Sequence, residues 1–365
     1  MTVSGTSTAR AVSPDSGLPW SAEGAWPVAE GIHRIPLPLP MDGLRAVNVY
    51  VIETPDGLTL IDGGWAIAVA RELLERCLRD IGHGFGDIRR FLVTHVHRDH
   101  YTLATVLGRE HGAEVALGIG EKPALDLLND AAALASYPFL DVLRNAGAHD
   151  LAEEWAAVPR DVPDPAWWRH PTRWLERDQA VEVGGRSLDA VHTPGHTPGH
   201  FVFADRAAGL LFAGDHVLPT ITPSIGFTLP PPVDPLGDFM ASLTKVRSLP
   251  DLTLLPAHGP VAPSSHARVD DLLRHHEDRL AASLAALDAG PRTAHEVARV
   301  LPWTRHEHPY DRLDAFARGL ATMETKSHLD LLVAQGRVAS EPSGDGVRYA
   351  AAPADRGAAG RRIPG

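Results

Sequence analysis

The sequence of 365 residues contains one cysteine, few lysines and no long uninterrupted run of apolar side chains. The single cysteine, Cys77, excludes an internal disulfide, and its helical surroundings favour burial over catalysis. The apolar runs are much shorter than the roughly 20 residues of a membrane helix, so no membrane association is expected. Residues 1–19 also lack the apolar stretch of a signal peptide, and we therefore expect a cytoplasmic protein.

An excess of positive charge is also missing. The chain has 34 Lys and Arg against 46 Asp and Glu, which gives a net charge of -12 at pH 7. Neutralising the phosphates of a nucleic acid requires a concentrated basic surface, and the pairs Arg89-Arg90 and Arg361-Arg362 are too small to provide one. Nucleic acid is therefore not an expected partner. A hydrophobic content of 44% is enough for a large domain and a smaller one.

Three histidines and an aspartate crowd into residues 95–100, directly after the strand-like run 90–93. His95 and His97 stand two apart at the end of an extended segment, so their rings project the same way and can share one cation. Asp99 and His100 begin the next turn and point toward a neighbouring site. Imidazole nitrogen and carboxylate oxygen suit zinc, with iron or manganese as alternatives. A solvated His-rich loop is the other interpretation, which the full pattern disfavours.

Three further candidate ligands follow strand-like runs downstream. His196 lies in the Pro- and Gly-rich turn at 193–200, Asp215 follows the apolar run 211–213, and His258 follows the run 254–256. Rigid strand ends can hold such side chains at metal distance. The sequence therefore predicts one metal centre assembled at the edge of a sheet.

The order HxHxDH, TPGHTPGH, GD and a late AHG resembles the metallo-β-lactamase superfamily, close to its glyoxalase II-like hydrolases, over residues 31 to 263. The resemblance implies an α/β fold, a four-layer αβ/βα sandwich with the metals at one sheet edge. It also implies that Asp62 steadies the site from behind the ligands. The metal ligands that it implies are His95, His97 and His196 for the first metal, Asp99, His100 and His258 for the second, and Asp215 as the bridge.

The residues after this motif depart from the family pattern. Members often continue DHxGG, whereas here Tyr101, Thr102, Leu103 and Ala104 follow. These larger side chains are expected to narrow the pocket. Tyr101 is either a catalytic hydroxyl that donates to a developing oxyanion or a buried packing residue.

Other histidines surround the predicted ligands. His192 and His200 flank His196, which is the middle histidine of the trio and the one that the resemblance makes a ligand. We expect His216 to lean away from the metals and to support the site or contact the substrate.

Strand patterns at 47–53, 58–61, 90–94 and 114–118 alternate with helical patterns at 66–81 and 100–111, as an α/β sandwich requires. The expected hydrolase domain is 21–264, and a C-terminal domain is expected at 265–350. Disordered tails are expected at 1–20 and 351–365. Within the hydrolase domain, the helix-rich segment 122–177 contains four tryptophans and is longer than a simple connection. These tryptophans either line a wall for an apolar substrate or pack the segment onto the core.

Residues 265–350 have a different pattern. One helix is expected at 266–287, a second at 293–300 and one or two more within 313–335, followed by a β-hairpin at 338–349. This order resembles the winged-helix domain appended to some lactamase-like hydrolases. Its acidic and basic residues are balanced, so we expect packing or homodimerisation through this domain rather than DNA binding.

The expected chemistry follows from two adjacent divalent cations, Zn²⁺ in the first instance. A water that bridges them has its pKa lowered toward about 7, and the resulting hydroxide can attack a carbonyl. Asp99 is the catalytic candidate for orienting this hydroxide and moving its proton. We therefore expect hydrolysis of a small-molecule thioester, ester or lactone, although no glutathione-binding signature supports a strict glyoxalase II role.

Three alternatives use the same motifs. A metal-dependent phosphodiesterase or ribonuclease would need the large extra domain of many RNA-processing members, for which the chain has no room. An iron-dependent sulfur dioxygenase would need one metal, whereas every second-site ligand is present here. A metal-stabilised regulator would need DNA binding that the acidic composition disfavours.

Overall fold

The computed structural model describes residues 18–40, 43–130, 137–158, 164–304 and 307–352, so both expected tails lie almost entirely outside the described residues. The chain forms two compact units: unit 1 contains residues 1–138 and 159–276, and unit 2 contains residues 139–158 and 277–365. Residues 139–158, inside the expected 122–177 segment, therefore group with the C-terminal part. The division between the two units falls between residues 276 and 277, inside the helix Ser265–Ala285, and the expected domain boundary at 264 and 265 stays a prediction.

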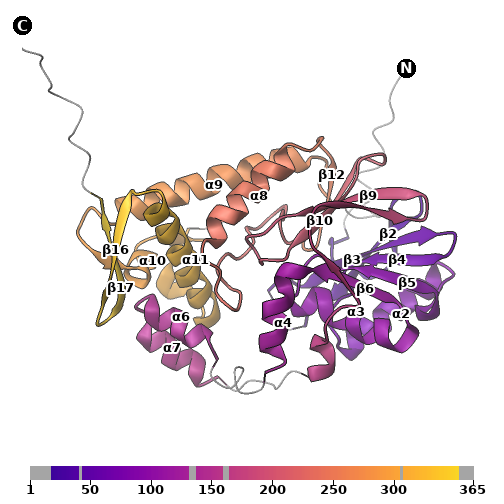
Figure 1. The fold of residues 1–365 in the computed structure, drawn as a ribbon, viewed down its shortest axis with the longest axis horizontal. Helices are drawn as coiled ribbons and strands as arrows, with labels where there is room; N and C mark the ends of the chain where they lie inside the picture. Colours follow the sequence, from indigo (N-terminus) through magenta and orange to yellow (C-terminus); the bar gives the residue numbers. More distant parts are fainter. Residues whose placement is uncertain (1–17, 41–42, 131–136, 159–163, 305–306, 353–365) are drawn as a thin grey trace, which may run out of the picture. The chain divides into compact units, whose positions relative to one another are not determined.

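Unit 1 is built on two sheets (Figure 1). The larger sheet is antiparallel from β1 to β4 and parallel from β4 to β7. Its strands in spatial order are β1 (Trp26–Ala29), β2 (Ile32–Pro38), β3 (Ala46–Thr54), β4 (Gly57–Ile61), β5 (Ile88–Leu92), β6 (Glu114–Gly118) and β7 (Arg173–Leu175). The expected 122–177 insertion thus contributes β7 to this sheet.

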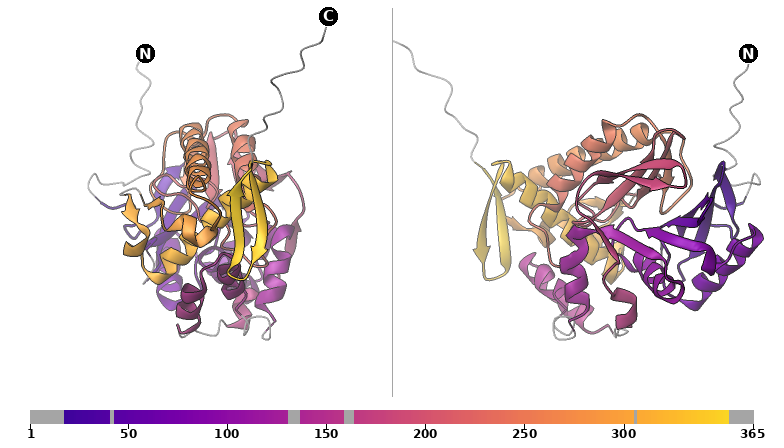
Figure 2. Two further views of the ribbon diagram at one scale, coloured as in Figure 1. Left: turned by 90° about the vertical axis from the view of Figure 1, so that its left-hand side faces the viewer. Right: turned by 45° about the vertical axis from the view of Figure 1, so that its right-hand side comes forward.

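The second sheet is antiparallel except for the parallel pair of β11 and β12. Its strands in spatial order are β12 (Thr253–Pro256), β11 (Leu210–Gly214), β10 (Phe201–Asp205), β9 (Arg186–His192) and β8 (Gln179–Val183). The right-hand view of Figure 2 shows the two sheets as separate layers. Tyr50 of β3 and Phe212 of β11 meet edge to face between them, with ring centroids 5.3 Å apart.

Alternation along β3 explains why both faces of the larger sheet are covered. Val47, Val49 and Val51 belong to the core cluster on the helical face, whereas Tyr50 and Ile52 belong to the cluster between the sheets. Helices α2 (Ala68–Asp80) and α3 (Arg98–His111) contribute their apolar sides to the first cluster. On the second sheet, α8 (Pro235–Arg247) is joined to α9 (Ser265–Ala285) by an ion pair between Arg247 and Asp270. The predicted α/β sandwich is confirmed.

Unit 2 consists of short helices, one long helix and a hairpin. The elements are α6 (Phe139–Asn145), α7 (His149–Ala156), β13 (Arg292–Thr293), α10 (Ala294–Ala298), β14 (Pro302–Trp303), β15 (His308–Pro309), α11 (Ala315–Ala334), β16 (Val338–Ser343) and β17 (Gly346–Ala351). Of the one or two helices expected within 313–335, the structure has one, α11. The helices and hairpin lie where they were expected, and the winged-helix assignment stays a prediction. Among the described residues, no helix combines the length and apolarity needed to cross a membrane.

The four tryptophans of the 122–177 segment pack against protein. In unit 2, Trp155 donates its indole N–H to Ala315 O and lies so close to Gly319 that a side chain there would collide with its ring. In unit 1, Trp168 is buried in the helical-face core, and Trp167 and Trp174 pack against it. Of the two interpretations of these tryptophans, the structure supports packing.

Candidate metal centre

Each predicted ligand follows the end of a strand of unit 1. His95 and His97 follow β5, and Asp99 and His100 occupy the first turn of α3. His196 lies in the loop between β9 and β10. Asp215 directly follows β11, and His258 is separated from the end of β12 by one residue. The structure brings all seven side chains together in two adjoining groups, which we call the first and second clusters. The first cluster is His95, His97, His196 and Asp215, and the second is Asp99, His100 and His258.

The first cluster converges on the Nδ1 atom of His97. This atom lies 3.0 Å from His95 Nε2 and 3.1 Å from His196 Nε2. Asp215 Oδ2 closes the group at 3.5 Å from His196 Nε2 and 4.0 Å from His95 Nε2. His97, the N-cap residue of α3, differs from the other histidines of the clusters because it presents Nδ1.

The second cluster is more regular. His258 Nε2 lies 3.4 Å from Asp99 Oδ2 and 3.3 Å from Asp215 Oδ1. His100 Nε2 lies 3.6 Å from each of the same two oxygens. Donors around a tetrahedral cation with bonds of about 2.1 Å are separated by about 3.4 Å. The spacing of this cluster therefore matches what such a cation requires.

Asp215 joins the two clusters. Its Oδ2 faces the first cluster and its Oδ1 faces the second, so one carboxylate serves both. Gly214, directly before it, has a φ of 52° and leaves no room for a side chain beside His200 and Thr94. The glycine therefore lets the end of β11 approach the other ligand segments closely.

Buried atoms without partners support a metal in this place. His100 Nε2, His258 Nε2 and Asp215 Oδ1 are buried and make no hydrogen bond in the described part of the chain. Leaving buried polar atoms unsatisfied is costly, and these three face one another. Imidazole nitrogens and carboxylate oxygens fit a divalent cation such as zinc.

The second nitrogen of each Nε2 ligand is held by a hydrogen-bond partner, which fixes the tautomer and the ring. His196 Nδ1 donates to Ser224 O at 2.8 Å, and His258 Nδ1 donates to Ala46 O at 2.8 Å. His95 Nδ1 lies 3.0 Å from the Thr94 hydroxyl. Ser224 O and Ala46 O are backbone carbonyls 28 and 212 residues away from their histidines, so the sequence pattern could not identify these two partners.

Asp62 supports the site as the resemblance implied. Its carboxylate accepts from the Thr94 N–H at 2.7 Å, from the Thr94 hydroxyl at 3.1 Å and from His100 Nδ1 at 2.9 Å. The residue has a φ of 62°, a left-handed conformation that is uncommon outside glycine. Such strain is typical of residues held in place for function.

The electrostatics of the clusters differ. Burial and the neighbouring His196 lower the pKa of His97 to about 3, and burial also lowers the pKa values of His95 and His196, so the first cluster presents neutral imidazoles. In the second cluster burial opposes charge on His100, but Asp99 and Asp62 raise its pKa to about 9. Burial alone would raise the pKa of Asp99, yet His100 and His258 hold it well below its usual range.

Tyr101 does not occupy the catalytic position considered for it. Its ring is fully buried in the helical-face core, and its hydroxyl donates to Arg169 O. Burial holds the pKa of this hydroxyl well above its usual value. We therefore correct the oxyanion-donor assignment: Tyr101 is a packing residue.

Thr102, Leu103 and Ala104 are also buried, and the expected narrowing or reshaping of the pocket by these residues stays a prediction. Gly63 lies so close to Ala104 of α3 that a Cβ atom at position 63 would collide with it.

The other histidines near the motif lie outside both clusters. His200 Nε2 accepts the N–H of Asp215 at 3.2 Å, so it holds the bridging residue rather than a metal. His192 Nε2 donates to Pro198 O at 2.9 Å within the His196 loop. His216 is buried edge to face against Phe239, with ring centroids 5.0 Å apart.

Two buried polar residues that the sequence analysis missed hold ligand loops. The amide of Asn48 donates to carbonyls on both sides of His258. The carboxyl of Glu121 accepts from the hydroxyl of Thr197, the residue after His196. Both contacts join segments more than 70 residues apart, so no local spacing could reveal them.

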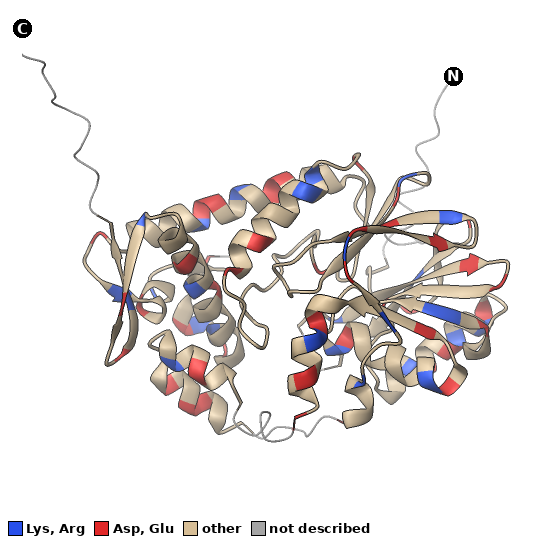
Figure 3. Ribbon diagram, in the orientation of Figure 1, with Lys and Arg blue, Asp and Glu red and all other residues tan. Residues whose placement is uncertain are grey.

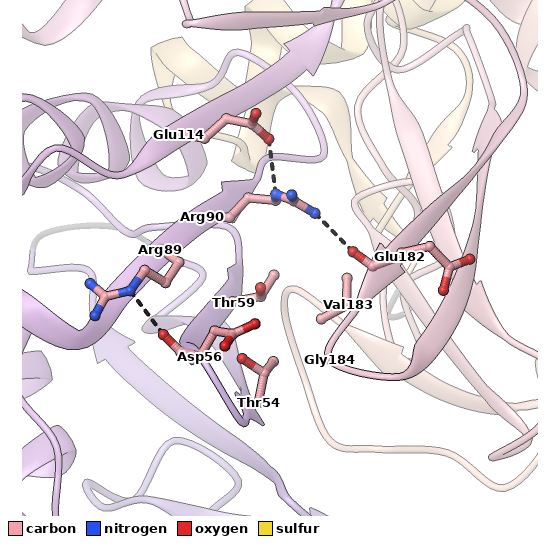
Figure 4. Close-up of a pocket in the computed structure, with 9 residues that line it drawn as sticks. All are labelled: Thr54, Asp56, Thr59, Arg89, Arg90, Glu114, Glu182, Val183 and Gly184. Atoms are coloured by element: carbon pink, nitrogen blue, oxygen red, sulfur yellow. Dashed lines mark hydrogen bonds and ion pairs between the residues drawn. The ribbon is translucent and has the colours of Figure 1, made fainter.

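A cavity of about 300 Å³ lies at the beginning of β5, away from the ligands that follow its end (Figure 4). Arg90 in this cavity forms an ion pair with Glu114 at 2.9 Å and donates to Glu182 O at 3.0 Å. Arg89 donates to Asp56 O at 2.9 Å. Arg90 and Glu114 neutralise one another, and we assign the cavity no ligand.

The sequence matches the model of one protein family. The model of the metallo-beta-lactamase superfamily matches residues 42–258, more than half of the chain. A probable metallo-hydrolase, YqjP, of Bacillus subtilis (strain 168) is 25% identical over 320 residues, which cover 87% of this chain and 96% of the relative. An atrochrysone carboxyl ACP thioesterase, AgnL7, of Paecilomyces divaricatus is 26% identical over 250 residues, which cover 67% of this chain and only 60% of the relative.

Solved structures agree with this result. A metallo-beta-lactamase family protein, TTHA1429, of Thermus thermophilus has a TM-score of 0.73 and 29% identity, covering 89% of this chain and all of that one. A beta-lactamase domain protein of Burkholderia ambifaria has a TM-score of 0.72 and 27% identity, covering 93% of this chain and 98% of that one. Together with the two clusters, these matches establish that the chain belongs to the metallo-beta-lactamase superfamily.

Proposed function

We propose that the protein is a hydrolase with two divalent cations, most suitably Zn²⁺, that cleaves a small-molecule thioester, ester or lactone. The observation that carries this proposal is Asp215, whose two oxygens face one cluster each. When bound, such cations lower the pKa of a water toward about 7 and polarise a carbonyl oxygen. His95, His97 and His196 would hold the first cation, and Asp99, His100 and His258 the second.

We assign Asp99 the role of orienting the water and moving its proton. Its carboxylate stays ionised because His100 and His258 hold its pKa below the usual range, against the effect of burial. It is 9% exposed, which leaves it at the boundary between the ligands and solvent. Ser224 O and Ala46 O fix the rings of His196 and His258, so the ligands need not reorganise during the reaction.

Support for a thioester comes from the similarity to the fungal acyl carrier protein thioesterase, which this chain matches over part of its length. A thioester carbonyl is an activated acyl group, and its thiolate leaving group needs little help from the protein. We infer that phosphodiesters are poor substrates. Figure 3 shows acidic and basic residues interspersed along α6 and α11, whereas α7 carries Asp and Glu but no Lys or Arg. Pairs such as Arg318 of α11 with Glu154 of α7 neutralise one another.

A substrate panel tests this proposal. The zinc-loaded full chain is assayed with a model thioester, an aryl ester, a lactone, a β-lactam, a phosphodiester and an RNA oligonucleotide, and an oxygen electrode follows a persulfide. We expect turnover of the thioester, ester or lactone, and none of these activities in Asp215→Ala prepared in parallel. Cleavage of the phosphodiester or RNA alone, or oxygen uptake with the persulfide alone, would replace the proposal with another reaction.

A further inference from the structure

Asn48 of β3 is fully buried beside the loop that carries His258. Its Nδ2 donates to Pro256 O at 2.9 Å and to Gly259 O at 3.0 Å, the carbonyls on the two sides of His258. Its backbone N–H donates to Ala257 O at 2.7 Å. One residue therefore fixes the whole segment 256–259 by three hydrogen bonds.

Arg34 of β2 sets the orientation of this amide. Its Nη1 donates to Asn48 Oδ1 at 2.9 Å and to Trp20 O at 2.6 Å, and its side chain is buried. Since a guanidinium has donors and no acceptor, it accepts no hydrogen bond from the amide. The oxygen of Asn48 must face Arg34, and both amide hydrogens must face the loop.

The same strand also sets the rotation of the His258 ring. Ala46, two residues before Asn48 in β3, accepts the hydrogen bond from His258 Nδ1 at 2.8 Å. The ring then presents Nε2 to Asp215 Oδ1 at 3.3 Å and to Asp99 Oδ2 at 3.4 Å. Asn48 fixes where the loop lies, and Ala46 fixes how the ring turns.

We propose that Asn48 is a positioning residue for the second cluster: its amide, oriented by Arg34, holds the 256–259 loop so that His258 Nε2 faces the carboxylates of Asp99 and Asp215. The inference rests on the two-cation centre of the proposed function. Loss of the Asn48 amide should weaken metal binding at the second cluster and not at the first, because its side-chain hydrogen bonds go to Arg34 and to the His258 loop. The first cluster is supported instead by Thr94 and Ser224.

Asn48→Asp tests this role with little change in size. The carboxylate keeps an acceptor for Arg34 but places an oxygen, not a donor, against the carbonyls of Pro256 and Gly259. The zinc-loaded full chain is equilibrated with increasing dipicolinate, and the zinc retained per chain is measured. We expect the metal of the second cluster to bind 10- to 100-fold more weakly, the usual effect of losing an outer hydrogen bond at a metal site. The metal of the first cluster should keep its affinity within about twofold.

Asn129→Asp is the control for the same change of side chain at an exposed position. The amide of Asn129 also donates to two carbonyls, Leu125 O at 2.7 Å and Trp168 O at 2.8 Å, but neither adjoins a ligand. Both zinc affinities should stay at the wild-type values in this variant. Zinc is expected to leave the wild-type chain in two steps as dipicolinate increases. The step that is missing in His258→Ala belongs to the second cluster.

Each result decides the inference. Wild-type affinity for both metals in Asn48→Asp overturns it, as does equal weakening of both metals. A wild-type chain that binds fewer than two zinc ions overturns the proposed function instead. If Asn48→Asp does not fold, Arg34→Met takes its place, because methionine has no hydrogen-bond donor for the amide oxygen of Asn48. Selective weakening of the second metal then supports the inference, and an unchanged second metal overturns it.

Discussion

The two clusters share Asp215 but differ in their other donor atoms and in the residues that support them. The first offers three neutral imidazoles, whereas the second has its own carboxylate, Asp99, and a further carboxylate, Asp62, behind His100. Oxygen donors suit harder cations than imidazoles do. Residues 95–100 thus contribute to two sites with different donor atoms. His95 and His97 point into the first cluster, and Asp99 and His100 point into the second.

The supports of the two clusters differ as well. In the first cluster, the ring of His95 is held by its neighbour Thr94 and that of His196 by Ser224 of the loop after β11. In the second, β3 supports His258 through both Ala46 and Asn48. The second cluster therefore depends on a strand that contributes no ligand of its own.

Removing the shared carboxylate should have the largest effect. Asp215→Ala deletes one donor from each cluster, so we expect the zinc content to fall below one ion per chain. Activity should fall by more than about 10³-fold, beyond the loss of a single oxyanion donor. Elemental analysis and thioester turnover measure both effects, and far-UV circular dichroism checks the fold. Near-normal turnover would show that Asp215 does not bridge the clusters.

Removing a histidine from one cluster at a time should separate the two sites. We expect His97→Ala and His258→Ala each to retain about one zinc ion per chain, because the other cluster keeps all of its donors. Cobalt substitution provides the readout, since the visible spectra of an imidazole-rich and a carboxylate-rich site differ. Identical residual spectra in the two variants would contradict the assignment of separate clusters.

Asp62→Asn should have an intermediate effect. The amide cannot serve as an anionic acceptor for both His100 Nδ1 and Thr94, so the ring of His100 loses its fixed orientation. We expect a 10- to 100-fold loss of metal affinity at the second cluster. Chelator competition measures this loss, with Asp56→Asn, in the turn before β4 and thus at the opposite end of that strand from Asp62, as a control. An effect confined to the first cluster would contradict the role of Asp62.

Glu121→Gln should have the smallest effect, and it depends on pH. Burial raises the pKa of Glu121 to about 7, although Thr197, Gly199 and Val96 act in the opposite direction. The folded state then binds this proton more tightly than the unfolded state, so stability is lost as the pH rises from about 4.5 to 7. Glutamine does not ionise, and the Tm of the variant relative to the wild type should rise across this window by about 2–4 °C.

The control for this prediction is Glu110→Gln. Arg71 lowers the pKa of Glu110, so the sign is reversed and the substitution should give no such rise. Thermal melts at pH 5, 6, 7 and 8 make the comparison. A Tm difference for Glu121→Gln that does not change with pH would show that burial does not penalise the charge of this group.

The ligands could be predicted from the sequence because each is a chemically distinctive residue at the end of a strand. His95, His97, Asp99 and His100 stand out by their spacing, and the structure places them beside the three downstream candidates. Asn48 and Glu121 could not be found in this way. Their partners lie in segments far along the chain, and an asparagine in a strand has the same local pattern whether or not it holds a loop.

The limits of the fold prediction have a similar cause. Strand and helix patterns predict β6 at its observed bounds and most other elements within a few residues. The grouping of α6 and α7 with the C-terminal unit rests on contacts such as Trp155 with Ala315, which periodicity does not encode. The catalytic interpretation of Tyr101 was wrong because its position beside the motif gives no sign that its side chain turns into the core.

The most direct test of the two-cluster centre is the metal content of the purified full chain after saturation with zinc and removal of the excess. The two-cluster centre should hold about two zinc ions per chain in the wild type and fewer than one in Asp215→Ala. A wild-type content of one or none, or two ions retained by Asp215→Ala, would contradict it.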